Sequence, residues 1–291
     1  MKHIDKSQPN SQVARQKLED WKVSFRENDK TLEQLYDEKD GTKLWELLRD
    51  KSFLFEALYL EQGGICCYCC SATSRDTLQN HIEHFIARNH DKRLTFEYDN
   101  LLHSCTIKET ITYVAKLNDT WENIANHLST TVDILWRLNT HIKSREVQLK
   151  DMIKLPKQPT HCGAHKSKFD KKPPTDKVNI INPISLPDCW ERFSFDGNGE
   201  VTSSQKDDEL VAKTIEVLNL NAPSLVDKRY SAYSEFVDDF YANPKVQYYH
   251  IQGDLIALRE FTASMLTEKR RLVYPFCVVE WSFLASILGL P

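Results

Sequence analysis

The chain has 291 residues, which is enough for one large domain or two ordinary ones. Charged residues make up 27% of the sequence and the formal net charge is −4, which excludes a globally basic nucleic-acid-binding protein and leaves only a local basic patch for such a partner. The first ten residues contain no apolar signal-peptide core, and no run of about 18 apolar residues occurs, so we expect a cytoplasmic protein without a membrane span.

Apolar residues at helical spacing predict a mainly α-helical chain, with α+β character contributed by a few short strands. The first predicted helix runs from Ser11 to about Lys30, and the second from Thr42 to Glu61. Two glycines directly after Gln62 end the second helix, because glycine readily adopts the left-handed conformation that caps helices. We therefore expect an N-terminal helical region over residues 1–62.

A cluster of cysteines follows these glycines directly. The run Cys66–Cys70 reads Cys-Cys-Tyr-Cys-Cys and contains two overlapping Cys-x-x-Cys pairs, while Cys105 and Cys162 follow singly. In a reducing cytosol, clustered cysteines indicate metal binding rather than disulfides, and a Cys-x-x-Cys turn can direct two thiolates at one tetrahedral Zn²⁺. The spacing leaves open which of the two pairs would bind the metal, and it also allows buried thiols that bind none.

The pair Glu83-His84 is the strongest candidate for a catalytic centre. Hydrolysis of a phosphodiester calls for a divalent ion, because the negative phosphate oxygens repel an attacking nucleophile. Glu83 offers a carboxylate ligand for Mg²⁺ or Mn²⁺, and His84, neutral near pH 7, can take the proton from the attacking water. Adjacent residues on an extended strand point to opposite faces, so both reach one site only from a bent segment. The alternative is a solvated carboxylate beside a core histidine that bonds to backbone.

Helices dominate the prediction for the rest of the chain. Two helices are predicted between Thr112 and Lys150, as an insertion over about residues 111–150 within a metal module that spans residues 63–185. Asp-Gly and Asn-Gly steps within residues 193–201 predict a hairpin. A C-terminal helical region over residues 186–291 is predicted to contain helices at Asp207–Asn219, Ser224–Tyr241, Tyr249–Thr267 and Phe276–Leu288.

The order of these pieces resembles one known family. The segments that carry the resemblance are Cys66–Cys69, Ile82–Phe85, Tyr98–Cys105, His161–Lys166, Ile181–Ile184 and Thr214–Asn221, followed by Arg229. In this order they resemble the HNH endonuclease superfamily, and most closely the PtuB-like HNH proteins of Septu and retron anti-phage systems. The resemblance covers about half of the chain. It implies a zinc ribbon joined to a ββα-metal nuclease module.

The resemblance also implies a role for each site residue. Glu83 would be a ligand of the catalytic metal, His84 the general base, and Asn100 the asparagine that orients the loop bearing the base. The implied structural zinc ligands are Cys66, Cys69, Cys105 and Cys162. Many HNH sites place a histidine directly after the last of these cysteines, where this chain has Gly163, and His165 is the nearest candidate for that ligand. Ala87 also replaces a proline that is usual after the Glu-His pair.

Two kinds of interaction surface are expected. The family resemblance implies an ABC-type ATPase partner (PtuA-like) and, in retron systems, a reverse transcriptase with its RNA–DNA product (msDNA). Aromatic residues on the C-terminal helices would either dock this partner or form core: Phe236, Phe240, Tyr241, Tyr248, Tyr249, Phe261, Trp281 and Phe283. The residues expected to contact a phosphate backbone are Arg88, Lys92, Arg93, Lys166 and Lys168, although the last two could equally be solvated loop lysines.

The sequence therefore predicts a metal-dependent HNH endonuclease that acts in anti-phage defence. DNA is the default substrate, and tRNA is the alternative, because a metal-plus-histidine site does not itself reject a 2′-hydroxyl. Two non-enzymatic alternatives are a zinc-ribbon adaptor that binds nucleic acid or the ATPase, and a zinc-stabilised helical interaction protein.

Overall fold

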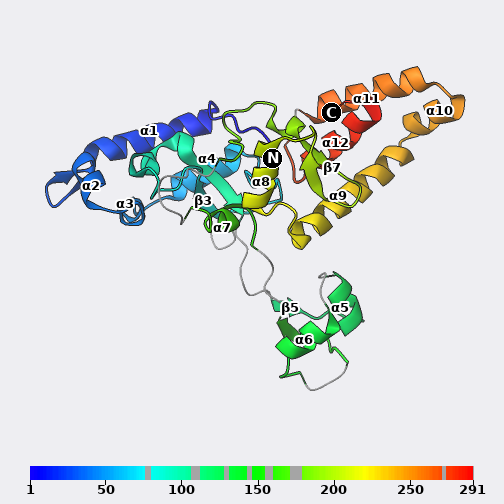
Figure 1. Cartoon of the computed structure of the whole chain (residues 1–291), viewed down its shortest axis with the longest axis horizontal. Coiled ribbons are helices and arrows are strands. Elements are labelled where there is room, and N and C mark those ends of the chain that lie inside the picture. The colour runs from blue at the N-terminus through cyan, green and yellow to red at the C-terminus, as the bar shows by residue number, and fades with distance from the viewer. Residues whose placement is uncertain are drawn as a thin grey trace.

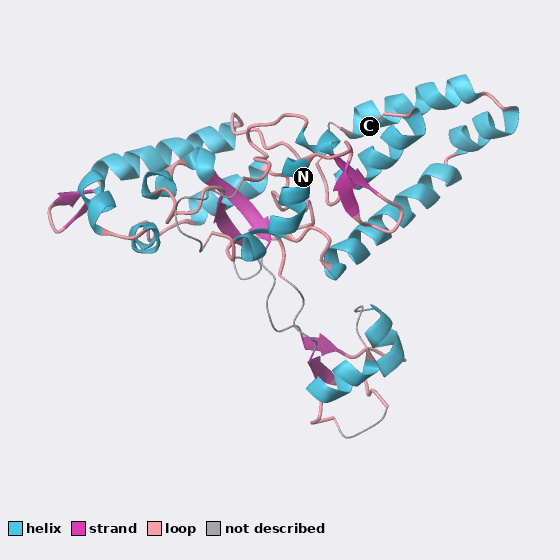
Figure 2. Ribbon diagram, in the orientation of Figure 1, coloured by secondary structure: helices cyan, strands magenta, loops and turns pink. Residues whose placement is uncertain are grey.

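The chain folds into a mainly helical structure with four two-stranded antiparallel sheets in its described part (Figures 1 and 2). The computed structural model describes residues 1–75, 80–105, 112–127, 131–142, 146–154, 160–170, 179–270 and 273–290. Among these residues, no helix is long and apolar enough to cross a membrane. The prediction of a helical body with short strands is confirmed at this level.

The N-terminal region forms a helical cluster around an apolar core that it shares with Phe96, Tyr98 and Leu101. Its elements are α1 (Pro9–Ser24), β1 (Arg26–Glu27), β2 (Lys30–Thr31), α2 (Leu32–Glu38), α3 (Gly41–Leu47) and α4 (Ser52–Glu61). Leu18, Leu44 and Leu58 are fully buried in this core. The single helix predicted over Thr42–Glu61 is wrong, because Leu48 is extended and Asp50 accepts hydrogen bonds from the following turn.

The β1–β2 hairpin and α2 were not predicted from the sequence. Thr31 begins α2 with a capping box, in which its hydroxyl accepts from the Gln34 amide while its own amide donates to the Gln34 side chain at 2.8 Å. A turn at Asn28 and Asp29, both with positive φ, reverses the chain between the two strands. The Thr-x-x-Gln spacing is the sequence signal that could have identified this short helix.

The central part of the fold is a hairpin covered by a short helix. Strand β3 (Asn80–His84) pairs antiparallel with β4 (Leu101–Cys105), and α7 (Cys162–Lys166) packs against β4. Two 3₁₀ turns, η1 (Lys92–Phe96) and η2 (Tyr98–Asn100), connect the strands. Helix α4 lies against both strands, so the hairpin is held between the N-terminal helices and α7.

The segment between β4 and α7 forms a small unit with its own core. It consists of β5 (Thr112–Val114), α5 (Trp121–His127), α6 (Val132–Leu138) and β6 (Met152–Lys154). The two predicted helices are present, and two strands that were not predicted pair antiparallel, with Thr112 opposite Lys154. Trp121, Ile124 and Leu135 are buried together, and Figure 1 draws the unit apart from the rest of the chain.

The C-terminal region begins with a hairpin and ends in an arm of helices. The elements are η3 (Cys189–Arg192), β7 (Phe193–Phe195), β8 (Val201–Ser203), α8 (Glu209–Leu218), α9 (Pro223–Ala242), α10 (Pro244–Gln252), α11 (Leu255–Lys269) and α12 (Cys277–Leu288). The predicted hairpin is confirmed, with Phe195 opposite Val201. The predicted helix Tyr249–Thr267 is broken, because Gly253 has a φ of 67° and caps α10 in the left-handed conformation.

Burial divides the aromatic residues of this arm into three groups, of which Tyr249 and Phe261 form the half-buried one. Phe236, Phe240, Trp281 and Phe283 belong to one buried core, so they are not available for docking. Tyr241 and Tyr248 are exposed, as are the aliphatic residues Ile251, Leu255 and Ile256 near the α10–α11 turn. Figure 1 shows this turn at the far end of the arm.

Candidate functional site

The first half of the candidate metal centre is a tight turn after α4. The Cys66 amide donates to the Ser71 carbonyl at 3.0 Å, and the Cys70 amide donates back to the Cys66 carbonyl at 3.1 Å. These bonds fold the backbone over, so the side chains of Cys66 and Cys69 project to the same side. The turn therefore presents two sulfurs as one pair.

The second half comes from two separate elements. Cys105 ends β4 and Cys162 begins α7, where its φ of 54° lies in the left-handed region. The four sulfurs of Cys66, Cys69, Cys105 and Cys162 lie within 4.8 Å of one another, and Cys69 Sγ is 3.9 Å from Cys105 Sγ. Tetrahedral Zn²⁺ with sulfur ligands requires about 3.8 Å between sulfurs. The four cysteines could thus hold a metal such as zinc.

The structure separates the two overlapping Cys-x-x-Cys pairs. Cys67 and Cys70 are buried but lie outside the four-sulfur cluster. The Cys67 amide donates to the His103 carbonyl, and the Cys70 carbonyl accepts from Phe276 at the start of α12. Cys67 and Cys70 thus connect the turn to β4 and to the start of α12. The geometry favours the pair of Cys66 and Cys69.

Polar groups surround the sulfur cluster. His161 Nδ1 lies 3.1 Å from Cys162 Sγ and 3.8 Å from Cys105 Sγ. Burial by itself would raise the pKa of the Cys66 thiol, but hydrogen bonds from the neighbouring cysteine thiols hold that pKa well below its ordinary value. A thiolate, which is the form that binds metal, is therefore favoured at one position of the cluster.

Glu83, on β3, is the most heavily bonded residue of the predicted catalytic pair. Its Oε1 accepts from the Tyr68 hydroxyl and lies 3.2 Å from the Lys166 ammonium, while its Oε2 lies 3.2 Å from His81 Nε2. Burial would raise the pKa of the Glu83 carboxyl, but Lys166 and then His81 outweigh it and lower that pKa to about 2. The carboxylate is therefore ionised at neutral pH.

Lys166 ties α7 to the end of β3. Its ammonium donates to Asp170 Oδ2 at 2.8 Å and to the His84 carbonyl at 3.2 Å, in addition to its contact with Glu83. Only 1% of the residue is exposed. Burial lowers the pKa of Lys166, but Glu83 and Asp170 more than compensate, so that pKa is raised. The burial does not fit the phosphate contact predicted from the sequence, because a buried and doubly paired ammonium cannot reach a nucleic-acid backbone.

His84 points away from Glu83, as expected for neighbours on an extended strand. Its Nε2 lies 3.0 Å from the Thr95 carbonyl, and its ring stands edge-on against Trp45 with 4.6 Å between centroids. A carbonyl only accepts hydrogen bonds, so Nε2 carries the proton and Nδ1 keeps a lone pair. Burial, and next the charge of Arg88, lower the pKa of His84 to about 3. The ring is therefore neutral at pH 7.

Asn100 fixes the loop that follows His84. Its Oδ1 accepts from the Ile86 amide at 2.7 Å, and its Nδ2 donates to the carbonyls of Ile86 and Leu94. The backbone carbonyl of Asn100 also accepts from the Phe85 amide. These contacts fix the backbone of Phe85 and Ile86, which directly follow His84.

Glu83 and His84 both line one pocket of about 290 Å³, although their side chains turn different ways. Arg88 and Gly163 line it as well. Arg88 is partly exposed, and no hydrogen bond or ion pair to its guanidinium occurs among the described residues. The pocket thus combines an anionic carboxylate, a neutral imidazole and an available cation.

The other predicted cationic residues lie outside this pocket. Lys92 donates to the Tyr36 carbonyl at 3.2 Å, and Arg93 pairs with Glu33 at 2.8 Å. Lys168 is exposed on the segment after α7. Among the predicted phosphate contacts, Arg88 is therefore the partly exposed one that lines the pocket with Glu83 and His84.

The structure does not bring His165 to Glu83. Residues two positions apart on a helix differ by about 200° in direction, so His165 faces away from the side on which Gly163 approaches the strand. His165 Nδ1 instead lies 2.9 Å from the Val217 carbonyl of α8. His81 lies beside Glu83 instead, and it was not predicted as a site residue. The spacing of the two residues could have indicated it, since residues two apart on a strand share a face.

One comparison with known protein families concerns the small unit between β4 and α7. Residues 113–156 match the LysM domain family. This LysM-like unit has the order strand, helix, helix, strand, and it lies in the sequence between Cys105 and Cys162. No curated protein matches the chain. The LysM-like unit contributes none of the four sulfurs and none of the residues that line the Glu83 pocket.

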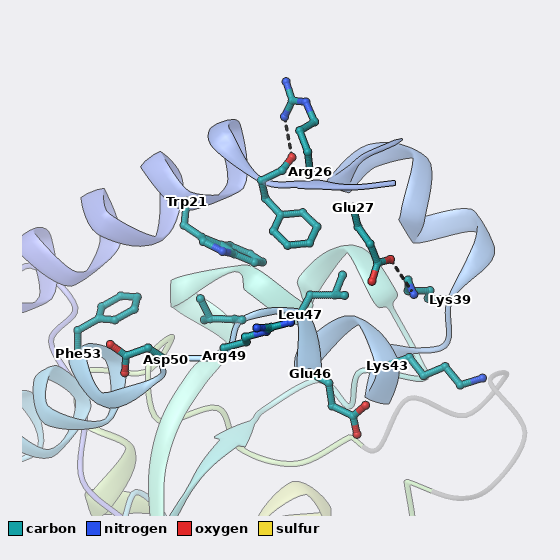
Figure 3. Close-up of a pocket in the computed structure, with 12 residues that line it drawn as sticks. Trp21, Arg26, Glu27, Lys39, Lys43, Glu46, Leu47, Arg49, Asp50 and Phe53 are labelled. Atoms are coloured by element: carbon teal, nitrogen blue, oxygen red, sulfur yellow. Dashed lines mark hydrogen bonds and ion pairs between the residues drawn. The ribbon is translucent and has the colours of Figure 1, made fainter. Parts of the chain in front are cut away.

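A second, larger pocket of about 760 Å³ lies among the N-terminal helices (Figure 3). Trp21, Leu47 and Phe53 supply apolar wall, and Glu27 pairs with Lys39 across one side at 2.9 Å. Its charged residues are of both signs, and it holds neither cysteine nor histidine. Among the described residues, no group of three or more closely spaced metal-ligating side chains lies in this pocket.

Proposed function

We propose that this chain is a metal-dependent endonuclease of the HNH type, which hydrolyses phosphodiester bonds in nucleic acid. One observation carries the proposal: Glu83 and His84, neighbours at the end of β3, line one pocket with Arg88 beside a cluster of four cysteines. Asn100 adds support, because it holds the loop after His84 by its side-chain amide. The resemblance of the same segments to HNH proteins is the second, independent support.

Each residue has a part that follows from its environment. The ionised Glu83 would hold a divalent cation, which neutralises charge that develops on the phosphate. His84 Nδ1 would accept the proton of the attacking water, because its ring is neutral and Nε2 is already bonded to Thr95. Arg88 would pair with a phosphate oxygen at the pocket rim.

The four cysteines would hold structural zinc. All four positions of a tetrahedral ion are then filled by sulfur, which leaves none for water, so this ion would have no direct part in hydrolysis. Its role would be structural, because the ion would hold together the turn after α4, the end of β4 and the start of α7. Those elements position Glu83 and Lys166.

The proposed setting is anti-phage defence together with an ABC-type ATPase, and in retron systems also with a reverse transcriptase and msDNA. The apolar tip of the C-terminal arm is the proposed docking surface, because Ile251 and Ile256 are about 80% and 75% exposed there. Introducing negative charge by Ile251→Glu with Ile256→Glu is expected to abolish co-purification with the ATPase while the melting temperature of the isolated chain stays unchanged. Retained co-purification would place docking elsewhere.

A non-catalytic zinc-ribbon adaptor is the alternative, and one contact favours it. Lys166 already balances the charge of Glu83 at 3.2 Å, so the carboxylate has a partner without any added cation. In this alternative the chain would bind nucleic acid or the ATPase, and another subunit would cut.

The deciding experiment measures cleavage of plasmid DNA and of total tRNA by the zinc-loaded chain. It is run with and without the ATPase, in Mg²⁺ or Mn²⁺, for wild type, His84→Ala, His84→Gln and the exposed control His141→Ala. We expect both His84 variants to lose cleavage at unchanged zinc content, and the control to cut normally. The substrate that is cut distinguishes DNA from tRNA. No cleavage by wild type under any condition would favour the adaptor.

A further inference from the structure

His81 and Glu83 form a pair of metal-binding atoms that the sequence did not assign. They lie two positions apart on β3, so their side chains leave the same face of the strand. His81 Nε2 is 3.2 Å from Glu83 Oε2, and the two residues line the same pocket. The other carboxylate oxygen, Oε1, is the one engaged by Tyr68 and Lys166. Oε2 itself accepts from the imidazole, and an ion bound by both atoms would replace the proton that Nε2 donates to it.

Gly163 lets the backbone of α7 approach these two atoms closely. A Cβ placed on Gly163 would lie 2.6 Å from Glu83 Oε2 and 2.8 Å from His81 Nε2, which are clashing distances. The requirement for glycine here is therefore steric. In the HNH resemblance a histidine often stands at this position and brings its ring to the metal. Here α7 brings only backbone to this place, and the nearby imidazole nitrogen belongs to His81 on β3.

We propose that His81 Nε2 and Glu83 Oε2 are neighbouring ligands of the catalytic divalent ion, with His81 in place of the histidine that Gly163 replaces. The inference rests on the proposed nuclease function. Neighbouring ligands of an octahedral ion at 2.0–2.2 Å are about 3 Å apart, close to the separation of these two atoms. Imidazole nitrogen suits first-row transition ions better than Mg²⁺, so the mixed donor set favours Mn²⁺.

The test detects the nitrogen ligand directly. Zinc-loaded protein is titrated with Mn²⁺, and electron spin echo spectra are recorded for wild type, His81→Gln and His165→Ala. Glutamine at position 81 keeps a hydrogen-bond donor for Glu83 but removes the imidazole. We expect ¹⁴N coupling from one imidazole in wild type and in His165→Ala, and its loss in His81→Gln. Mn²⁺ affinity should fall by roughly tenfold or more in His81→Gln and stay unchanged in the control.

Two results would overturn the ligand assignment. One is Mn²⁺ that binds wild type without ¹⁴N coupling, and the other is coupling that persists in His81→Gln or disappears in His165→Ala. The cleavage assay is read separately. Nitrogen coupling without cleavage would support the ligand pair and refute the nuclease function. Cleavage without nitrogen coupling would support the nuclease function and refute the ligand pair.

Discussion

Asn100 and Ile86 are joined by two hydrogen bonds that run in opposite directions, since the side-chain amide of Asn100 accepts from the N–H of Ile86 and donates to its carbonyl. Aspartate at position 100 would keep the acceptor for the Ile86 amide but would turn the donor into a negative oxygen that faces two carbonyls. We expect Asn100→Asp to lower the free energy of unfolding by about 2 kcal/mol and to abolish cleavage. Urea denaturation and the plasmid assay measure the two effects.

The zinc content of this variant serves as its control. Asn100 contacts none of the four cysteines, so zinc is expected to stay bound in Asn100→Asp. Full activity with normal zinc would contradict the bracing role of this side chain.

Matched serine substitutions test the zinc register. Cys66 and Cys67 are neighbours with similar burial, but only Cys66 belongs to the four-sulfur cluster. We expect Cys66→Ser to bind much less zinc than wild type and Cys67→Ser to retain roughly one ion per chain. Elemental analysis after gel filtration provides the measurement, and the reverse pattern would assign the site to Cys67 and Cys70.

A buried ion pair anchors the N-terminal residues to the fold. Lys6 pairs with Glu61 and donates to the Leu101 carbonyl at 2.6 Å, while Ser11 and Tyr98 donate to the same carboxylate. Lys6→Met would leave that carboxylate buried without its cation, so we expect a loss of about 3 kcal/mol in the free energy of unfolding.

The exposed pair of Lys30 and Glu38 provides the control for this ion pair. Its side chains are 45% and 47% exposed, so Lys30→Met should change the free energy of unfolding by less than about 1 kcal/mol. Equal effects of the two substitutions in urea denaturation would show that Lys6 contributes no more than a surface lysine.

Thiol chemistry and clustering indicated a metal site from the sequence, but spacing left the pair Cys66 and Cys69 and the pair Cys67 and Cys70 equally open, and only the family resemblance favoured the first pair. Asn100 could be chosen only through the family resemblance, since nothing local reveals which peptide an asparagine will bind. His165 was chosen because it is near Cys162 in sequence, but helix geometry turns it toward Val217. Strand periodicity alone places His81 on the same face as Glu83. Its proposed role as a metal ligand also depends on Gly163, which approaches both side chains from a distant segment.

Helix breaks and short strands were the hardest features of the fold to predict. The break before Ser52 comes from two hydrogen bonds to Asp50, which a hydrophobic pattern does not record. Strand β5 is only three residues long and gains its stability from β6, 38 positions further on. Such pairing depends on tertiary contact and leaves little trace in local sequence.

The LysM-like unit should be removable without loss of the metal centre. Thr112 and Lys154 are paired at the base of the unit, so their Cα atoms are about 5 Å apart and a short Gly-Ser linker can replace residues 112–154. We expect the shortened chain to keep its zinc and its unfolding temperature within a few degrees. Zinc analysis and calorimetry measure this, and loss of zinc would show that the unit supports the cysteine cluster.

The pairing of β5 with β6 also affects how readily the metal centre closes during folding. Cys105 and Cys162 are 57 positions apart, and an unordered segment of that length would have to lose its conformational freedom when both cysteines bind one ion. Once the strands are paired, the effective loop shortens to about 16 positions, which lowers the entropic penalty by about 1 kcal/mol, a factor of roughly five in zinc affinity. A domain inserted between two metal ligands therefore shortens the effective loop that must close when both ligands bind the ion.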